Sequence, residues 1–251
     1  MTNTLRGKTA LVTGASRGIG AATAIALARA GVSRFLLHYN SFYEGAQDTL
    51  KGVVAAGASG SLLNANLGTL EGIHAFVDTM PREIDLLVNN AGALVQRVAT
   101  TECTEALYDE VMNLNVKSAY FITQAVLPHM MKRREGVIVN LSSIAARTGG
   151  GTGAAVYAAA KGSILTLTKG WARELAPHGI RVNAVSPGTV DNAFHERFST
   201  KQILDSVVAL TPAGRLGTNE EVADTILFLC SDRARYIHGQ TIEINGGMMA
   251  P

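Results

Sequence analysis

The sequence predicts an α/β fold in which helices cover both faces of a parallel β-sheet. First, short apolar runs alternate along the chain with longer helical stretches, which is typical of repeated strand–helix–strand units. Second, a chain of 251 residues, 47% hydrophobic and 17% charged, is large and apolar enough to bury a substantial core. Sheets of this kind bind ligands outside the carboxyl ends of their strands, so functional residues are expected there.

Seven apolar runs are expected to be the strands, and six stretches between them the helices. In chain order the expected strands are 9–13, 34–39, 61–65, 85–89, 136–141, 180–185 and 240–244. The expected helices are 19–30, 44–56, 69–80, 104–133, 154–176 and 220–229. Gly31 and Gly57 fit caps at the ends of the first two helices.

One long stretch, about residues 189–218, is predicted to be irregular and to form a lid or binding loop. The chain shows neither an internal repeat nor a low-complexity linker, so residues 1–251 are expected to form a single domain.

Composition excludes several functions. The formal net charge is only +2, from 22 basic and 20 acidic residues, and the basic cluster 132–134 is interrupted by Glu135, so neither nucleic acid nor a membrane surface is an expected partner. Cys103 and Cys230 offer neither a disulfide framework nor metal-ligand spacing. With no signal-like or membrane-spanning run, we expect a soluble protein in a reducing cytoplasm.

A glycine-rich loop, residues 13–20, joins the first strand to the first helix. Glycine lets the backbone approach a ligand closely, and a helix N-terminus attracts a pyrophosphate, so the loop is a candidate dinucleotide site. Its Gly-x-x-x-Gly-x-Gly spacing, formed by Gly14, Gly18 and Gly20, differs from the common dinucleotide fingerprint. A purely structural turn is the alternative.

Three further motifs carry chemistry. Tyr157 and Lys161 stand four residues apart on one helix face, where the ammonium is expected to lower the pKa of the phenol, although such pairs also arise by chance. Ser143 follows a strand, where its hydroxyl would polarise a carbonyl or only begin a loop. The run 89–92, Asn-Asn-Ala-Gly, suits either a turn or a wall beside a cofactor.

These motifs, followed by Pro187-Gly188, occur in the order and at the separations typical of short-chain dehydrogenases/reductases. The chain resembles that family over about residues 5–248. The resemblance implies a Rossmann-type, doubly wound parallel sheet of seven strands in the order 3-2-1-4-5-6-7. It also implies a homotetramer and a small carbonyl or alcohol substrate.

The resemblance assigns a role to each catalytic residue. It makes Tyr157 the general acid in carbonyl reduction, or the base in alcohol oxidation. Lys161 would lower the pKa of Tyr157 and hold the nicotinamide ribose, Ser143 would bind the substrate oxygen, and Asn115 would support a water relay to the lysine. No metal is expected.

The expected cofactor is NADP(H), with NAD(H) possible. The second strand ends in Tyr39, Asn40 and Ser41 where NAD selectivity usually needs a carboxylate, and Arg17 would bind a 2′-phosphate. Asn66 stands where the family commonly has aspartate beside the adenine. The expected cofactor contacts are Gly14, Ser16, Arg17, Gly18, Ile19, Gly20, Tyr39, Asn40, Ser41, Asn66, Leu67, Asn90, Ala91, Gly92, Tyr157, Lys161, Pro187, Gly188 and Val190.

Three hypotheses about the protein's function stay open. Segments 92–97, 148–153 and 188–195 resemble the family's sugar and keto-uronate reductases, and Arg97 and His195 would meet a carboxylate or hydroxyls there. The alternative is a 3-oxoacyl-[acyl-carrier-protein] reductase, for which Arg134 matches one carrier-binding arginine while His178 stands at the second position. The third is a regulatory protein that binds dinucleotide without turnover.

Overall fold

The computed structural model describes residues 5–250, apart from the side chains of residues 195–197. Seven strands form one parallel sheet in the order β3-β2-β1-β4-β5-β6-β7, which confirms the expected topology. The strands are β1 (Thr9–Val12), β2 (Arg34–Tyr39), β3 (Ser59–Asn64), β4 (Leu86–Asn89), β5 (Gly136–Leu141), β6 (Ile180–Pro187) and β7 (Thr241–Ile244).

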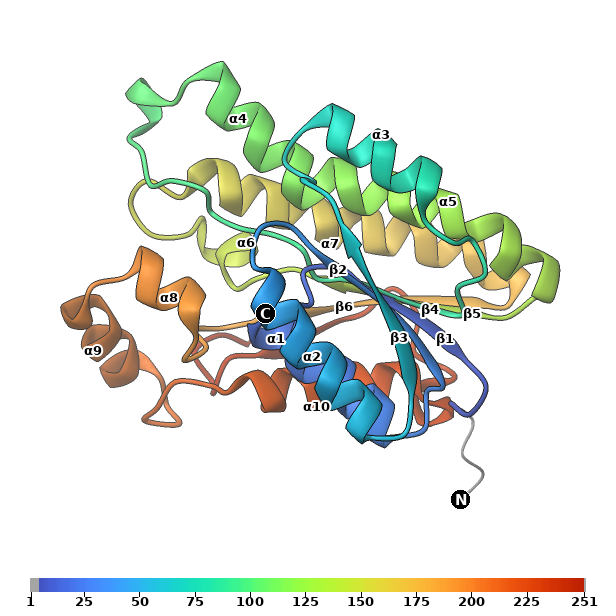
Figure 1. Ribbon diagram of the computed structural model, residues 1–251. Helices are drawn as coiled ribbons and strands as arrows, with labels where there is room; N and C mark the ends of the chain where they lie inside the picture. The colour runs from blue at the N-terminus through green and yellow to red at the C-terminus, as the bar shows by residue number, and fades with distance from the viewer. Residues whose placement is uncertain (1–4, 251) are drawn as a thin grey trace.

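Helices pack on both faces of the sheet (Figure 1). The helices are α1 (Gly18–Arg29), α2 (Tyr43–Ala55), α3 (Leu70–Thr79), α4 (Glu105–Met112), α5 (Ser118–Arg133), α6 (Ala145–Thr148), α7 (Ala155–Leu175), α8 (Ala193–Phe198), α9 (Lys201–Leu210) and α10 (Asn219–Cys230). Short 3-10 turns lie at Thr100–Glu102, Ala176–His178 and Asp232–Ala234.

Two apolar cores hold these layers together. On one face Leu27 of α1, Val53 of α2 and Ile226 of α10 pack against the sheet in one buried cluster. On the other face Phe76 of α3 and Ile122 of α5 belong to a second cluster. The central strands β1, β4 and β5 are buried between two helical layers and are therefore mostly apolar, which is why they can be recognised from sequence.

Polar side chains pair the strands beside the site. The register sets Asn89 of β4 opposite Asn140 of β5. The buried amide of Asn89 donates to Asn140 Oδ1 at 2.9 Å, and Asn140 Nδ2 donates to Thr168 Oγ1 on α7 at 2.9 Å. Buried amides are costly unless hydrogen-bonded, so this chain of bonds favours a single alignment of β4, β5 and α7.

Two expected elements differ from the structure. The helix expected over 104–133 is interrupted by a π-helical turn, Asn113–Lys117, between α4 and α5. The stretch 189–218, expected to be irregular, contains α8 and α9, so that prediction was wrong in its local structure. Thr200 caps α9 by accepting a hydrogen bond from Ile203 N, but α9 has no buried residue among its ten. Its apolar residues Ile203, Leu204, Val207 and Val208 do recur at helical spacing, a signal that the prediction of an irregular stretch left unused.

Candidate active site

The glycine loop is built against the segment that follows β4. Thr13 Oγ1 accepts hydrogen bonds from the backbone N–H of Asn90 at 3.0 Å and of Ala91 at 2.9 Å. The side-chain amide of Asn90 donates to the carbonyls of Thr13 and Gly14. A Cβ added to Gly14, whose φ is +64°, would stand 3.0 Å from Ala91 Cα. The loop therefore needs glycine both for its conformation and for its close approach.

Helix α1 begins at Gly18 and turns its N-terminus toward this loop. In the described part of the chain, the helix's N-cap residue, Arg17, makes no side-chain capping bond. The first amides of α1 thus keep donors for an anion, which fits the pyrophosphate of a dinucleotide. The Arg17 guanidinium carbon lies 5.2 Å from the centroid of the Phe42 ring, close to the residues that follow β2.

The ends of β2 and β3 form the side of the site where an adenosine would lie. Asn64 Nδ2 donates to the carbonyl of Asn40, which ties the two strand ends together. Asn66 Oδ1 accepts from Gly68 N at 3.0 Å, so this oxygen is partly used within its own turn. Leu67 is 1% exposed and packs in the apolar cluster that contains Phe76 and Ile122, so its side chain belongs to the core.

The residues predicted to be catalytic converge from β5 and α7. Ser143 lies just beyond β5, and Tyr157 and Lys161 lie in the first two turns of α7. Ser143 forms a side-chain hydrogen bond with Tyr157. Lys161 Nζ donates to the carbonyl of Leu141 at 2.9 Å and lies 5.7 Å from the centroid of the Tyr157 ring. The structure thus brings together Ser143 and the Tyr157–Lys161 pair, which the sequence placed in two separate motifs.

Burial controls the titration of this group. It raises the pKa of Tyr157 to about 12, and the hydrogen bond from Ser143 only partly opposes this. Burial also lowers the pKa of Lys161 to about 8. The net shift in the pKa of the phenol is therefore upward, opposite to the expected direction, because removal of the phenolate from water outweighs the hydrogen bond from Ser143.

Asn115 joins the group from the π-helical turn. Its amide nitrogen donates to the carbonyls of Ala93 and Val111, both at 2.9 Å. A Cβ on Gly92 would stand 2.6 Å from Asn115 Oδ1 and 2.8 Å from Lys161 Nζ, so both polar atoms border the same space beside Gly92. Among the described residues, Asn115 Oδ1 is buried with no hydrogen-bond partner. It is therefore an available acceptor next to Lys161, and π-helical turns often occur at functional sites.

The segment after β6 closes the other side of the glycine loop. Gly188 N donates to Ile244 O, and Val190 is 3% exposed. The Asn192 amide donates to Asn219 Oδ1 at 2.9 Å. Both side chains face Gly18, because a Cβ on that glycine would stand 3.6 Å from Asn219 Oδ1. The sequence analysis missed Asn219. Its position at the first residue of α10 was the only local signal available.

A small apolar cavity of about 50 Å³ adjoins Tyr157. Its walls are mainly aliphatic, with Leu94, Val98, Leu107 and Val156 among them. The lid contributes Phe194, whose ring centroid lies 5.9 Å from that of Tyr157 and which the sequence analysis also missed. Of the two expected substrate residues, Arg97 donates to backbone carbonyls of the lid and of a neighbouring loop. The His195 side chain lies outside the described residues.

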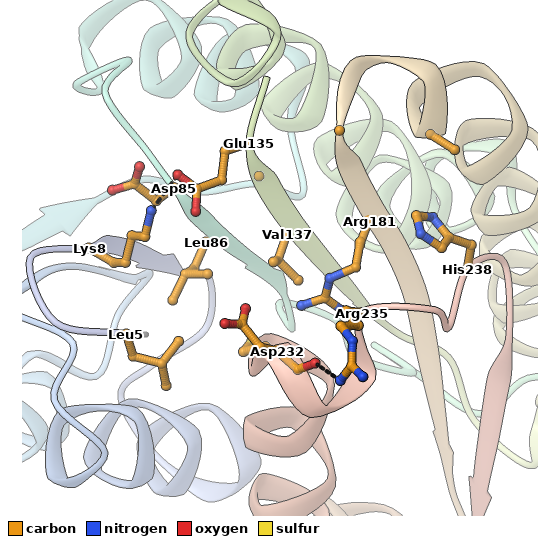
Figure 2. A pocket seen from close by; sticks show the side chains of 14 residues that line it. Leu5, Lys8, Asp85, Leu86, Glu135, Val137, Arg181, Asp232, Arg235 and His238 are labelled. Atoms are coloured by element: carbon orange, nitrogen blue, oxygen red, sulfur yellow. Dashed lines mark hydrogen bonds and ion pairs between the residues drawn. The ribbon is translucent and has the colours of Figure 1, made fainter. Parts of the chain in front are cut away.

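A second cavity, of about 290 Å³, lies at the amino-terminal ends of β4, β5 and β6, away from these residues (Figure 2). Its charged lining is largely paired within the protein. Lys8 forms an ion pair with Glu135 at 2.6 Å, and the Arg181 guanidinium donates to the carbonyls of Leu229, Ser231 and Ala234. The residues that can carry catalysis therefore lie at the opposite edge of the sheet.

This fold and site define a dinucleotide-binding oxidoreductase. A family profile described as "Enoyl-(Acyl carrier protein) reductase" matches residues 14–249. The chain belongs to the short-chain dehydrogenase/reductase family, as the sequence motifs predicted. It is an NAD(P)-dependent oxidoreductase.

Named relatives fall into two groups. The chain is 36% identical to a 3-oxoacyl-[acyl-carrier-protein] reductase of Staphylococcus aureus over 244 residues, 96% of this chain and 98% of the relative. Among solved structures, a candidate NAD(P)-dependent gluconate 5-dehydrogenase from Beutenbergia cavernae with bound NADP is 33% identical, covers 100% of both chains and has a TM-score of 0.92. The NADH-dependent reductase A1-R′ responsible for alginate metabolism is 35% identical, covering 99% of this chain and 100% of its own, with a TM-score of 0.85.

Within the described residues, no helix is long and apolar enough to span a membrane. The same residues contain no group of three or more histidine, cysteine or acidic side chains placed to hold a metal ion.

Proposed function

We propose that this protein is an NADP(H)-preferring reductase that interconverts a carbonyl and a secondary alcohol on a sugar or keto sugar acid. The observation that carries the proposal is that Ser143 and Lys161 both lie near Tyr157, while Lys161 and Asn115 border the space beside Gly92. The segment after β4, which includes Gly92, is joined to the glycine loop by the hydrogen bonds that Thr13 accepts from it.

In the direction of reduction, Tyr157 gives its phenolic proton to the carbonyl oxygen. The Ser143 hydroxyl donates a hydrogen bond to the same oxygen and stabilises its developing negative charge. The bound nicotinamide supplies the hydride, and the protein supplies position and electrostatics. Lys161 holds the nicotinamide ribose and, as a cation, favours the phenolate that forms. Asn115 Oδ1 would accept a hydrogen bond from a water molecule, and that water would relay a proton to Lys161.

The direct test is the Tyr157→Phe variant, which lacks the phenolic hydroxyl but keeps the ring. We expect NADPH binding to stay within twofold of the wild type and turnover to fall about 10²–10⁴-fold, the usual contribution of a general acid. Undiminished turnover would contradict the role of Tyr157.

The NADP(H) preference rests on charge at the end of β2. Arg17 stacks over Phe42, and Asn40 and Ser41 follow the strand where a carboxylate would otherwise repel a 2′-phosphate. We expect a higher kcat/KM with NADPH than with NADH, and an Arg17→Gln variant should lose the NADPH rate selectively. A wild-type preference for NADH would overturn this part of the proposal.

The carbohydrate substrate is supported by the sugar-acid dehydrogenase and alginate-pathway reductase among the similar structures. A 3-oxoacyl-[acyl-carrier-protein] substrate is the second candidate, favoured by the relatives of that name and by the apolar cavity beside Tyr157. A protein without turnover is disfavoured because the catalytic set is complete. A screen of NADPH oxidation with keto sugars, uronate-derived keto acids, diketones and acetoacetyl thioesters separates these, since activity confined to thioesters would favour the second candidate.

The proposal includes one cofactor-binding domain over residues 1–251, with the segment 189–218 as its lid, assembled as a homotetramer in the cytoplasm. Tyr108 of α4 and Tyr120 and Met131 of α5 are exposed apolar side chains that would suit a subunit contact. Cys103 and Cys230 are free thiols, which suits a reducing compartment. Sedimentation velocity would test the tetramer.

A further inference from the structure

The Arg97 side chain connects three segments that are far apart in the sequence. It belongs to the loop after β4, its Nε donates to the carbonyl of Phe198 at 2.9 Å, and its Nη1 donates to the carbonyl of Thr152 at 2.9 Å. Phe198 is the last residue of α8 in the lid, and Thr152 belongs to the glycine-rich loop before α7. Both acceptors are backbone atoms, so the connection does not depend on the side chains of its partners.

A strained turn precedes Arg97. Val95 has a φ of +66°, and Gln96 N donates to Leu94 O at 2.8 Å, which closes a three-residue turn of the rare positive-φ kind. A β-branched residue in this region is unfavourable and persists only where its surroundings enforce it. Here Leu94 is buried, and Val98 N donates to Gly153 O on the far side of Arg97. The turn is therefore held from both ends.

The lid segment that Arg97 contacts covers the catalytic tyrosine. The Phe194 ring lies with its centroid 5.9 Å from that of Tyr157, and the Phe198 ring lies 5.0 Å from that of Phe194. Asn192 Oδ1 accepts from Phe194 N and so begins α8 beside the glycine loop. Figure 1 shows α8 and α9 extending to one side of the sheet.

We propose that Arg97 is a positioning residue that holds α8 over Tyr157, like a latch. It thereby sets the fraction of protein molecules in which the lid is closed and can bind substrate. This inference rests on the proposed function, because it assigns the lid to the carbonyl substrate. It differs from direct recognition by Arg97 of a substrate carboxylate, because a latch acts on every substrate that the lid encloses. A guanidinium can serve two carbonyls at fixed angles, whereas an ammonium cannot reproduce that geometry.

The test compares Arg97→Gln with the wild type on one neutral and one anionic carbonyl substrate that the wild type reduces. We expect KM to rise at least fivefold for both substrates, kcat to fall less than threefold, and the dissociation constant of NADPH to stay within twofold. Arg97→Lys should recover only part of the loss. Lys201→Gln is the matched control, because this lid lysine pairs with Asp205 on its own helix and should leave KM unchanged.

A second readout needs no turnover. Limited proteolysis should cut the segment 193–210 at least fivefold faster in Arg97→Gln than in the wild type or in Lys201→Gln. A KM increase confined to the anionic substrate, or an unchanged cleavage rate, overturns the latch. If the wild type reduces no carbonyl compound, the proposed function fails, while the proteolysis comparison alone still supports or overturns the contact between Arg97 and the lid.

Discussion

The imidazole of His38 joins the glycine loop to the end of β3. Its Nδ1 accepts a hydrogen bond from Gly14 N–H at 3.0 Å, and its Nε2 donates to the carbonyl of Ala65 at 3.1 Å. Because an amide N–H can only donate and a carbonyl can only accept, the ring must be neutral with its proton on Nε2. Burial at 2% exposure enforces this state by lowering the pKa of His38 to about 4.

This contact predicts a cofactor-binding defect in a residue that touches no reacting atom. In His38→Leu, Gly14 N–H and Ala65 C=O lose their partners, at a typical cost of about 1–3 kcal/mol for a buried group. We expect the dissociation constant of NADPH to rise about tenfold, the equivalent of about 1.4 kcal/mol, with kcat at saturating cofactor within threefold of wild type. NADPH fluorescence titration measures the effect.

The matched control is His38→Asn, whose Oδ1 can still accept from Gly14 N–H. It should recover part of the affinity. Leu and Asn variants that fold normally by circular dichroism and bind NADPH as tightly as the wild type would refute the positioning role of His38.

His38 also predicts a loss of stability in mild acid. An unfolded histidine, with a pKa near 6.5, takes up a proton below that pH, whereas folded His38 stays neutral until about pH 4. The unfolded state then binds more protons, so the free energy of unfolding decreases as the pH falls between these values. The loss from this group is about 2 kcal/mol between pH 7.5 and pH 5. Urea unfolding at both pH values should show a smaller loss in His38→Asn, and equal losses would contradict the prediction.

The fold could be predicted because each strand is a short apolar run between turns. The bounds of β2 and β5 agree with the predicted 34–39 and 136–141. Helix α9 was missed although Ile203, Leu204, Val207 and Val208 recur at helical spacing and Thr200 offers an N-cap, so this part of the lid could have been predicted from the sequence. The π-helical turn was also missed, and it holds Asn115, whose bond to the carbonyl of Ala93 joins segments that are far apart in the sequence.

The candidate site also contains both residues whose proximity the local sequence predicts and residues that only the folded chain brings together. The proximity of Tyr157 and Lys161 is predictable because four residues of helix place them on one face, whereas their catalytic role was predicted from the family resemblance. The pairs Phe194–Tyr157 and Asn192–Asn219 join segments whose proximity exists only in the folded chain, so no local pattern announces them. The direction of the Tyr157 pKa shift was missed for a similar reason, since it depends on burial by all the elements around the phenol.

Lys161 predicts a basic limb in the pH profile of carbonyl reduction. Tyr157 keeps its proton until about pH 12, so the general acid stays protonated through the neutral range. Lys161, with a pKa lowered by burial to about 8, loses its charge above that pH and with it the stabilisation of the phenolate. We expect kcat/KM to fall above about pH 8. Lys161→Arg, which stays charged, should be less active but show no such limb. If Lys161→Arg keeps the basic limb of the pH profile, the limb arises from the titration of a group other than Lys161.

Asn219 predicts an electrostatic effect on cofactor binding that is separable from stability. In Asn219→Asp the side chain keeps its shape and can still accept from Asn192, but it places a negative charge beside Gly18 and the N-terminus of α1. That charge competes with the cofactor phosphates for the same positive end of the helix. An acidic group in the first turn of α10 favours that helix, so stability should not fall. We expect the dissociation constant of NADPH to rise about tenfold or more at low salt and less at 0.5 M NaCl, because salt screens exposed charges.

The control variant Asn219→Ala removes the bond to Asn192 without adding charge and should show a smaller loss of NADPH affinity that does not depend on salt. Equal affinities in the Asp and Ala variants at low salt would mean that Asn219 lies too far from the phosphates to act on them.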